Sequence, residues 1–153
     1  MTQTTGSVRF EGVVKKYGEV TALKKLDLSI APGKLVTLLG PSGCGKTTTL
    51  RLIAGLEMAT EGSIHIGGHD VTHLTATYRK VSMVFQSYAL FPHMTVRENV
   101  AYGLTGKSMH KAEAAQKADD GLELVGLAGF GDRLPSELSG GLQQRVAVAR
   151  AIV

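Results

Sequence analysis

Residues 40–48 read Gly40-Pro41-Ser42-Gly43-Cys44-Gly45-Lys46-Thr47-Thr48, a glycine-rich stretch that ends in a lysine and two threonines. The apolar run Leu35–Leu39 precedes it, and the helix-forming segment Thr49–Ala54 follows it. A strand, a glycine-rich loop and a helix in this order fit the phosphate-binding pattern G-x-x-x-x-G-K-[ST]. An ordinary glycine turn is the alternative, but such a turn requires neither the lysine nor the hydroxyl nor both flanks in register.

The chemistry of this loop favours phosphate. Glycine lets successive backbone N–H groups turn toward an anion, because no Cβ stands in the way. A helix that begins near Lys46 adds unpaired N–H donors and the positive end of its dipole. We expect the Lys46 ammonium to reach the β- and γ-phosphates of a nucleotide and the Thr47 hydroxyl to hold Mg²⁺.

The composition is that of a globular domain. The 153 residues are 43% hydrophobic and 20% charged, which is enough to bury a core. Basic residues account for the net charge of +4, but they are scattered along the chain, so this charge indicates a solvated surface. The single cysteine, Cys44, excludes an internal disulfide and agrees with a reducing compartment.

Hydrophobic patterning predicts alternating strands and helices. Strands are expected over Val8–Val14 and Leu26–Ile30, an edge strand and turn over Glu61–Gly68, and strands buried on both faces over Leu35–Leu39 and Lys80–Phe85. A turn is expected over Lys15–Glu19. Helices are expected from Lys46 to Gly55, over Val96–Leu104 behind a Thr95–Glu98 capping box, over Met109–Val125, and from Ser139 onward.

A second candidate for phosphate binding is Ser139-Gly140-Gly141. A serine cap and two small residues open a helix whose first N–H groups have no partner, as in the first loop. Taken alone, this pattern is commonly just a helix cap. Roughly 100 residues after a P-loop, and followed by Gln143-Gln144-Arg145, it becomes a more specific sign of an oxyanion site.

With these motifs the sequence resembles the nucleotide-binding subunits of ABC transporters over Val8–Val153. Leu138–Arg145 looks like the signature of that family, and Val84–Gln86 looks like its Q-loop. Tyr17 stands where the family places an aromatic residue before the P-loop. The segment Ser87–Val96 is similar to the importers for polyamines, ferric iron, sulfate, phosphonates and maltose.

The resemblance implies an α/β fold, a P-loop NTPase (ABC ATPase) core with an N-terminal antiparallel β subdomain and a helical subdomain, incomplete at the C-terminus. It divides the chain into the β subdomain with the P-loop core (8–85), the Q-loop with the helical subdomain (86–138), and the signature helix (139–153). It implies a peripheral subunit on the cytoplasmic face of the membrane, which couples ATP binding and hydrolysis to solute import.

The resemblance also implies a role for each site residue. Tyr17 would stack on adenine, and Gln86 would help to hold Mg²⁺ and the attacking water while it senses the transmembrane partner. Lys46 and Gln86 are therefore the expected catalytic residues, and Thr47 and Gln86 the expected ligands of Mg²⁺. The residues expected to bind ATP are Tyr17, Gly40, Pro41, Ser42, Gly43, Cys44, Gly45, Lys46, Thr47, Thr48, Ser139, Gly140 and Gly141.

Several partners follow from the same resemblance. Ser139–Gly141 would grip the γ-phosphate of ATP on the opposite subunit, in a homodimer or with a paired nucleotide-binding subunit. Tyr88–Met94 would receive the transmembrane permease subunits, because exposed Leu90, Phe91 and Met94 suit a partner surface. Burial of this loop on its own domain is the alternative. A periplasmic or extracellular solute-binding protein would act indirectly, and no nucleic acid is expected.

The pattern departs from the family in two places. Leu142 stands where the family usually has glutamine, and we expect a modest effect. The apolar run ending in Asp-Glu and the later histidine of the family do not follow the signature; Asp132 is no substitute, because nearby glycines make a poor strand. We therefore interpret the chain as the amino-terminal part of an ABC ATPase. Alone, we expect it to bind nucleotide weakly, not to hydrolyse it, and to expose an apolar sheet edge beside the P-loop strand.

Two alternatives remain open at this point. A small P-loop kinase has a suitable length, but it gains nothing from Ser139–Arg145. A soluble ABC protein that acts on nucleic acid or ribosomes suits the basic isoelectric point of about 9.3. The segment Tyr88–Val96 favours a membrane partner instead.

Overall fold

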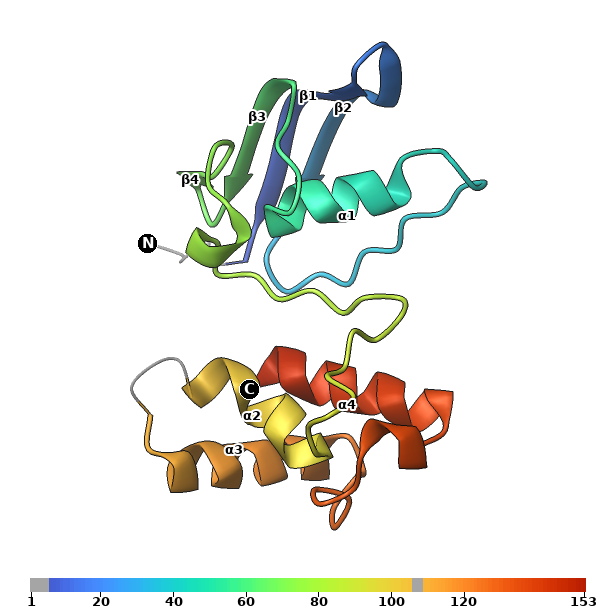
Figure 1. The fold of residues 1–153 in the computed structure, drawn as a ribbon. Coiled ribbons are helices and arrows are strands. Elements are labelled where there is room, and N and C mark those ends of the chain that lie inside the picture. The colour runs from blue at the N-terminus through green and yellow to red at the C-terminus, as the bar shows by residue number, and fades with distance from the viewer. Residues whose placement is uncertain (1–5, 106–108) are drawn as a thin grey trace. The chain divides into compact units, whose positions relative to one another are not determined.

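A computed structural model describes residues 6–105 and 109–153 of the chain (Figure 1). Its contacts divide the chain into two compact units, Met1–Val81 and Ser82–Val153. Each unit has its own hydrophobic core, so each is described by itself. No helix in the described part of the chain is both long enough and apolar enough to span a membrane.

From residue 6 onward, the first unit is an antiparallel sheet with one α-helix. Its strands are β1 (Val8–Tyr17), β2 (Val20–Ile30), β3 (Glu61–Ile66) and the short β4 (His69–Asp70), in the order β2-β1-β3-β4. Helix α1 (Lys46–Ala54) follows the glycine-rich loop, and a short 3-10 turn, η1 (Ala76–Tyr78), comes later. Leu52 of α1 joins the sheet residues in the core, which comprises Phe10, Val13, Leu23, Leu52, Ile64 and Val71. Figure 1 shows α1 lying across one face of the sheet.

The hairpin between β1 and β2 is longer than expected. The predicted turn over Lys15–Glu19 is wrong, because Lys15, Lys16 and Tyr17 continue β1 and pair with Leu23, Thr21 and Val20. Pairing with β2 satisfies the backbone hydrogen bonds of these residues, and their polar side chains do not prevent them from joining a strand. The turn therefore shrinks to Gly18-Glu19, and Lys15 and Tyr17 stand on a strand.

The two strands expected to be buried on both faces do not form. Leu35–Leu39 and Lys80–Phe85 are irregular, and Leu35 and Leu39 are 98% and 87% exposed. An apolar run becomes a strand only where neighbouring strands take its backbone hydrogen bonds. Within the described ranges the sheet ends at β2 and β4, and neither run pairs with it.

The C-terminal end of α1 is closed by a buried arginine. Arg79 is 5% exposed, and its guanidinium donates to the carbonyls of Leu52, Ile53 (3.1 Å), Leu74 (2.8 Å) and Thr72 (3.4 Å). The last carbonyls of a helix have no partner inside it, so this side chain satisfies them. Burial lowers the pKa of Arg79, but an arginine stays charged far above neutral pH.

We expect Arg79→Met to lower the free energy of unfolding of the first unit by about 2–3 kcal/mol, because buried carbonyls lose charge-assisted hydrogen bonds. Arg79→Lys should restore only part of this loss, since an ammonium cannot span four carbonyls. Denaturant unfolding followed by circular dichroism measures both variants. Lys24→Met, at an exposed position of β2, is the control, and an equal loss there would contradict the prediction.

The described residues of the second unit form a bundle of three α-helices. They are α2 (Val96–Thr105), α3 (Lys111–Leu124) and α4 (Gly140–Ile152), with a 3-10 turn, η2 (Pro135–Glu137), before α4. The core of the bundle comprises Val96, Val100, Ala101, Leu104, Ala114, Ala118, Leu122, Leu127, Leu138, Val146 and Ala149. The predicted helices are thus confirmed to within a few residues at their ends.

Helix α2 begins with the predicted capping box. The backbone N–H of Thr95 donates to Glu98 Oε2 at 2.8 Å, and the N–H of Glu98 donates to Thr95 Oγ1 at 3.2 Å. The hydrogen bond from the Thr95 backbone, and then the one from the Thr95 side chain, lower the pKa of Glu98, because they stabilise its carboxylate. The box fixes the point at which the irregular segment before α2 becomes helix.

Candidate functional site

The glycine-rich loop forms a cavity at the start of α1. The cavity has a volume of about 520 Å³ and is lined by Ala22, Ser42, Gly43, Gly45, Lys46, Thr47 and Thr48. Gly45 has φ 89°, and a Cβ there would lie 3.2 Å from the carbonyl oxygen of Ala22. A side chain at position 45 would therefore push the loop away from β2, so glycine is required.

The first turn of α1 presents donors and no acidic side chain to this cavity. Gly45 caps the helix without a side-chain bond, so the first N–H groups of α1 lack partners inside the helix. The Lys46 ammonium donates to the carbonyls of Gly40 and Pro41, each at 2.7 Å, and to Cys44 Sγ at 3.3 Å. Among the described residues no carboxylate pairs with Lys46. An incoming anion would be its first charged partner.

Tyr17 lies at the end of β1 and is 44% exposed. The Lys15 ammonium lies 4.7 Å from the centre of its ring, and Glu57 accepts a hydrogen bond from its hydroxyl. Burial and then the Glu57 carboxylate raise the pKa of Tyr17, whereas the hydrogen bond from Lys15 chiefly lowers the pKa of Glu57. The ring is thus held by two charged neighbours that the motifs did not reveal.

The second predicted phosphate site lies at the start of α4. Ser139 stands at the N-cap with extended backbone, and its side chain makes no capping hydrogen bond. Ser139, Gly140 and Gly141 are exposed. They adjoin a cavity of about 680 Å³ lined by Val125, Ser139, Gly141, Leu142, Gln144, Arg145 and Val148. The serine hydroxyl and the first N–H groups of α4 can therefore reach an external oxyanion.

Leu142, the departure from the family pattern, packs against the core of the helical bundle. It also lines the cavity beside Ser139. An apolar side chain at this position gains burial that a glutamine would gain only through its methylene groups.

The segment after Gln86 is held against α4. Gln86 is exposed in a turn, and Tyr88 and Ala89 have φ 61° and 49°. The Arg150 guanidinium donates to the carbonyls of Tyr88 (2.9 Å) and Ala89 (2.8 Å). Left-handed backbone is unfavourable for residues with a side chain, so these two bonds hold a strained conformation.

The loop Tyr88–Met94 is less exposed than expected. Leu90, Phe91 and Met94 are each half-buried rather than exposed, so the expectation of exposed apolar side chains is wrong in degree. Leu90 packs against the helical core, and Phe91 lies 4.5 Å from the Tyr102 ring, between ring centres. These apolar side chains pack against the second unit itself, as the alternative interpretation held.

A buried asparagine fixes the same loop. Asn99 is fully buried; it accepts a hydrogen bond from the N–H of Phe91 (2.7 Å) and donates to the carbonyls of Phe91 (3.1 Å), Met94 (3.1 Å) and Thr95 (3.0 Å). One side-chain amide therefore satisfies four backbone groups of a segment without regular structure.

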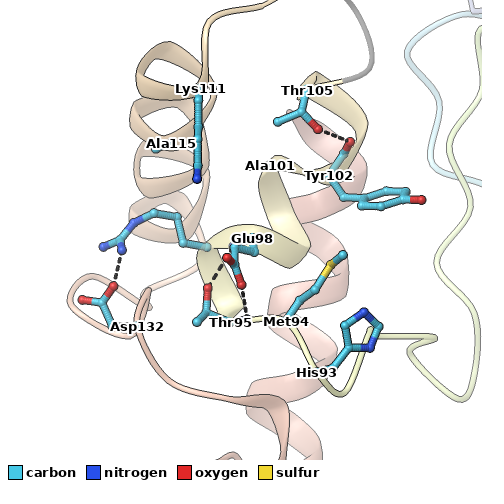
Figure 2. Close-up of a pocket in the computed structure, with 11 residues that line it drawn as sticks. His93, Met94, Thr95, Glu98, Ala101, Tyr102, Thr105, Lys111, Ala115 and Asp132 are labelled. Atoms are coloured by element: carbon cyan, nitrogen blue, oxygen red, sulfur yellow. Dashed lines mark hydrogen bonds and ion pairs between the residues drawn. The ribbon is translucent and has the colours of Figure 1, made fainter.

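A third cavity lies beside this loop. Its volume is about 610 Å³, and Figure 2 shows Thr95 and Glu98 between Lys111 and Asp132 on one side and His93 and Tyr102 on the other. Arg97 also lines it and pairs with Asp119 (2.8 Å) and Asp132. The prediction that Asp132 is a loop residue is confirmed, and the structure gives it an ion pair.

The structure thus groups the predicted site residues into two sets. Tyr17 and the loop Gly40–Thr48 belong to the first unit, and Gln86 and Ser139–Gly141 belong to the second. Sequence reasoning missed Lys15 and Glu57 beside Tyr17, and Asn99 and Arg150 beside the loop. Lys15 stands two residues before Tyr17 and shares a strand face with it, but this signal was hidden because the sequence predicted a turn over Lys15–Glu19.

Comparison with known proteins decides the family. A profile of the family described as "ABC transporter" matches residues 23–153, most of the chain. The chain belongs to the ABC transporter family. Family membership removes the small-kinase alternative. Two solved structures of the ABC cassette MJ0796 share the fold: a dimer in a post-hydrolysis state bound to ADP and Pi (TM-score 0.85, 37% identity) and a dimer of the bacterial cassette (TM-score 0.86, 36% identity).

Each of these matches covers 95% of this chain and 68% of the cassette. They confirm the predicted α/β fold class of an ABC ATPase, although two of its expected strands are irregular here. Curated relatives of the ABC chain include the Fe(3+) ions import ATP-binding protein FbpC of Brucella abortus (strain 2308), 69% identical over 148 residues. The protein of the same name from Agrobacterium fabrum is 66% identical over 153 residues. The matches cover 97% and 100% of this chain, which spans 42% and 43% of those relatives.

Proposed function

We propose that this ABC chain is the ATP-binding region of an importer that couples ATP hydrolysis to the uptake of ferric iron. The observation that carries the proposal is the cavity at the start of α1, where Lys46 has neutral acceptors only. Identity of 65–69% to seven proteins named for Fe(3+) import supports the choice of solute.

The residues of the cavity fit a nucleotide triphosphate. Its glycines bring N–H groups close to an anion, and its volume of about 520 Å³ lies in the usual range of small-molecule sites. Lys46 would exchange two carbonyl acceptors for β- and γ-phosphate oxygens, which are charged and therefore bind an ammonium more strongly. Tyr17 would take the adenine on its exposed ring face.

The proposed ligands of Mg²⁺ are Thr47 and Gln86. Thr47 fits this role, because it is exposed at the first turn of α1 and lines the cavity. When bound, Mg²⁺ neutralises charge on the transferred phosphoryl group. Gln86 also fits as an oxygen donor, since its exposed amide lies outside regular structure. Lys46 and Gln86 are the proposed catalytic residues of this chain.

The remaining proposals concern partners. Ser139, Gly140 and Gly141 would bind the γ-phosphate held by an opposite nucleotide-binding subunit, and exposure of all three supports this. Tyr88–Met94 would receive a transmembrane permease subunit on the cytoplasmic face of the membrane. The bonds from Asn99 and Arg150 support a docking role, because they give this loop a fixed shape before any partner binds. A solute-binding protein would deliver the ferric iron.

Reconstitution tests the function. The full-length protein, assembled with its membrane subunits in liposomes, should take up radiolabelled Fe³⁺ when ATP is present on the nucleotide-binding side. ADP should support no uptake, and sulfate, spermidine and maltose should not accumulate. Uptake of one of these solutes in place of iron would contradict the assignment of ferric iron. ATP hydrolysis that no solute stimulates would contradict the importer itself.

A further inference from the structure

Tyr17 is held by two charged side chains from different parts of the first unit. Lys15 lies two residues before it, so both side chains project from the same face of β1. The Lys15 ammonium lies 4.7 Å from the ring centre of Tyr17 and 3.1 Å from Glu57 Oε2. It also donates to the carbonyl of Met58 at 2.9 Å. Glu57 in turn accepts a hydrogen bond from the Tyr17 hydroxyl.

Burial makes this arrangement more rigid than a surface ion pair. The side chains of Lys15 and Glu57 are 13% and 23% exposed, whereas those of the nearby pair Lys16 and Glu61 are 45% and 56% exposed. Solvent screens an exposed pair and lets its side chains move, and a buried pair escapes much of both effects. Tyr17 itself is 44% exposed, so part of its ring remains accessible.

Contacts at both ends of α1 connect Lys15 and Glu57 to the phosphate cavity. At the C-terminal end, the N–H groups of Leu56 and Glu57 both donate to the carbonyl of Arg51, so the helix end places Glu57. At the N-terminal end, Gly45 lies against Leu23, and Leu23 pairs with Lys15 across the β1–β2 hairpin. The helix that opens on the phosphate cavity thus also positions the ring.

We propose that Glu57 and Lys15 are positioning residues that hold the Tyr17 ring at a fixed place and angle relative to the phosphate cavity. The ammonium covers one face of the ring and Glu57 fixes its hydroxyl, which leaves the other face for the adenine of ATP. A base meets a ring that is already ordered, so binding ATP does not have to immobilise it. This inference rests on the proposed function, since it concerns how the same site binds the adenine of ATP.

Affinity measurements with two ligands on the full-length protein distinguish the contribution of the Tyr17 ring from that of the phosphate loop. ATP contains a base, and inorganic tripolyphosphate does not. We expect Glu57→Gln and Lys15→Met each to weaken ATP binding by about fivefold, because an immobilised side chain is worth roughly that factor. Tripolyphosphate binding should not change. Lys15→Arg should keep ATP affinity close to wild type, since a guanidinium also binds over an aromatic ring.

Two further variants complete the design. Tyr17→Leu removes the ring, so adding Glu57→Gln to it should cause no further loss of ATP affinity. Glu61→Gln is the matched control: it removes a carboxylate that pairs with Lys16 at 2.8 Å on the same sheet. In steady-state hydrolysis, KM for ATP should rise in Glu57→Gln while kcat stays unchanged.

The outcomes are distinct. Equal ATP affinity in Glu57→Gln and Glu61→Gln would overturn the inference and leave the proposed function intact. A parallel loss of ATP and tripolyphosphate affinity would also overturn it, because the two residues would then support the loop rather than the ring. Wild-type protein that binds neither ligand would contradict the proposed function itself.

Discussion

Lys46→Ala should abolish ATP turnover by the full-length protein without unfolding it. The ammonium is the only cationic side chain lining the cavity at the start of α1 within the described residues. Loss of one preorganised charged donor from a phosphoryl-transfer site lowers kcat by about 100-fold or more. The fold should survive, because the ammonium contacts only the loop's own carbonyls and Cys44.

Steady-state phosphate release at saturating ATP measures this effect, and denaturant unfolding of the same preparation checks the fold. The free energy of unfolding should change by less than about 0.5 kcal/mol. Lys34→Ala is the control, since Lys34 is exposed and lies outside the cavity. Turnover within a fewfold of wild type in Lys46→Ala would remove the catalytic role of Lys46.

Asn99→Asp should be among the most destabilising single-atom changes available in the second unit. Asn99 Nδ2 faces the carbonyl oxygens of Phe91, Met94 and Thr95, and the residue is fully buried. A carboxylate would place a buried charge against three acceptors that it cannot pair with. We expect a loss of about 3–5 kcal/mol at neutral pH, the usual cost of an uncompensated buried charge.

The loss should shrink as the pH falls. Burial and the facing carbonyls raise the pKa of the new carboxyl above the unfolded value, so the penalty begins to fall as the pH drops through the folded pKa, where a proton restores a donor, and disappears only below the unfolded pKa. Denaturant unfolding relative to wild type at each pH measures this. Gln116→Glu makes the same chemical change on the exposed face of α3 and should cost little. A loss in Asn99→Asp that is small at every pH would contradict the prediction.

Local patterns were enough to predict most of the helices. The α1 segment, the Thr95–Glu98 box and the apolar spacing of α3 depend on residues within a few positions of each other, so the sequence displays them directly. The glycine-rich loop belongs to the same class, since its geometry is set by the glycines and the helix that follows.

Strands and long-range contacts were less accessible. Leu35–Leu39 reads as a buried strand, but its state depends on which strands lie beside it, and no pattern within the run supplies that information. The contact between Lys15 and Glu57 joins residues 42 positions apart, and the bond from Arg150 to Ala89 joins residues 61 apart. Neither pair could be matched before the fold was known, because every charged residue has many candidate partners.

The hydrogen bonds from Arg150 to the carbonyls of Tyr88 and Ala89 limit which residues can occupy positions 88 and 89. Two consecutive left-handed residues tolerate glycine or asparagine well and β-branched residues poorly. The two hydrogen bonds from the Arg150 guanidinium to the carbonyls of Tyr88 and Ala89 offset the strain of this backbone conformation. Positions 88, 89 and 150 should therefore vary together in evolution. Valine or isoleucine at 88 or 89 should occur in homologues that lack arginine at 150 and should be absent from homologues that have it.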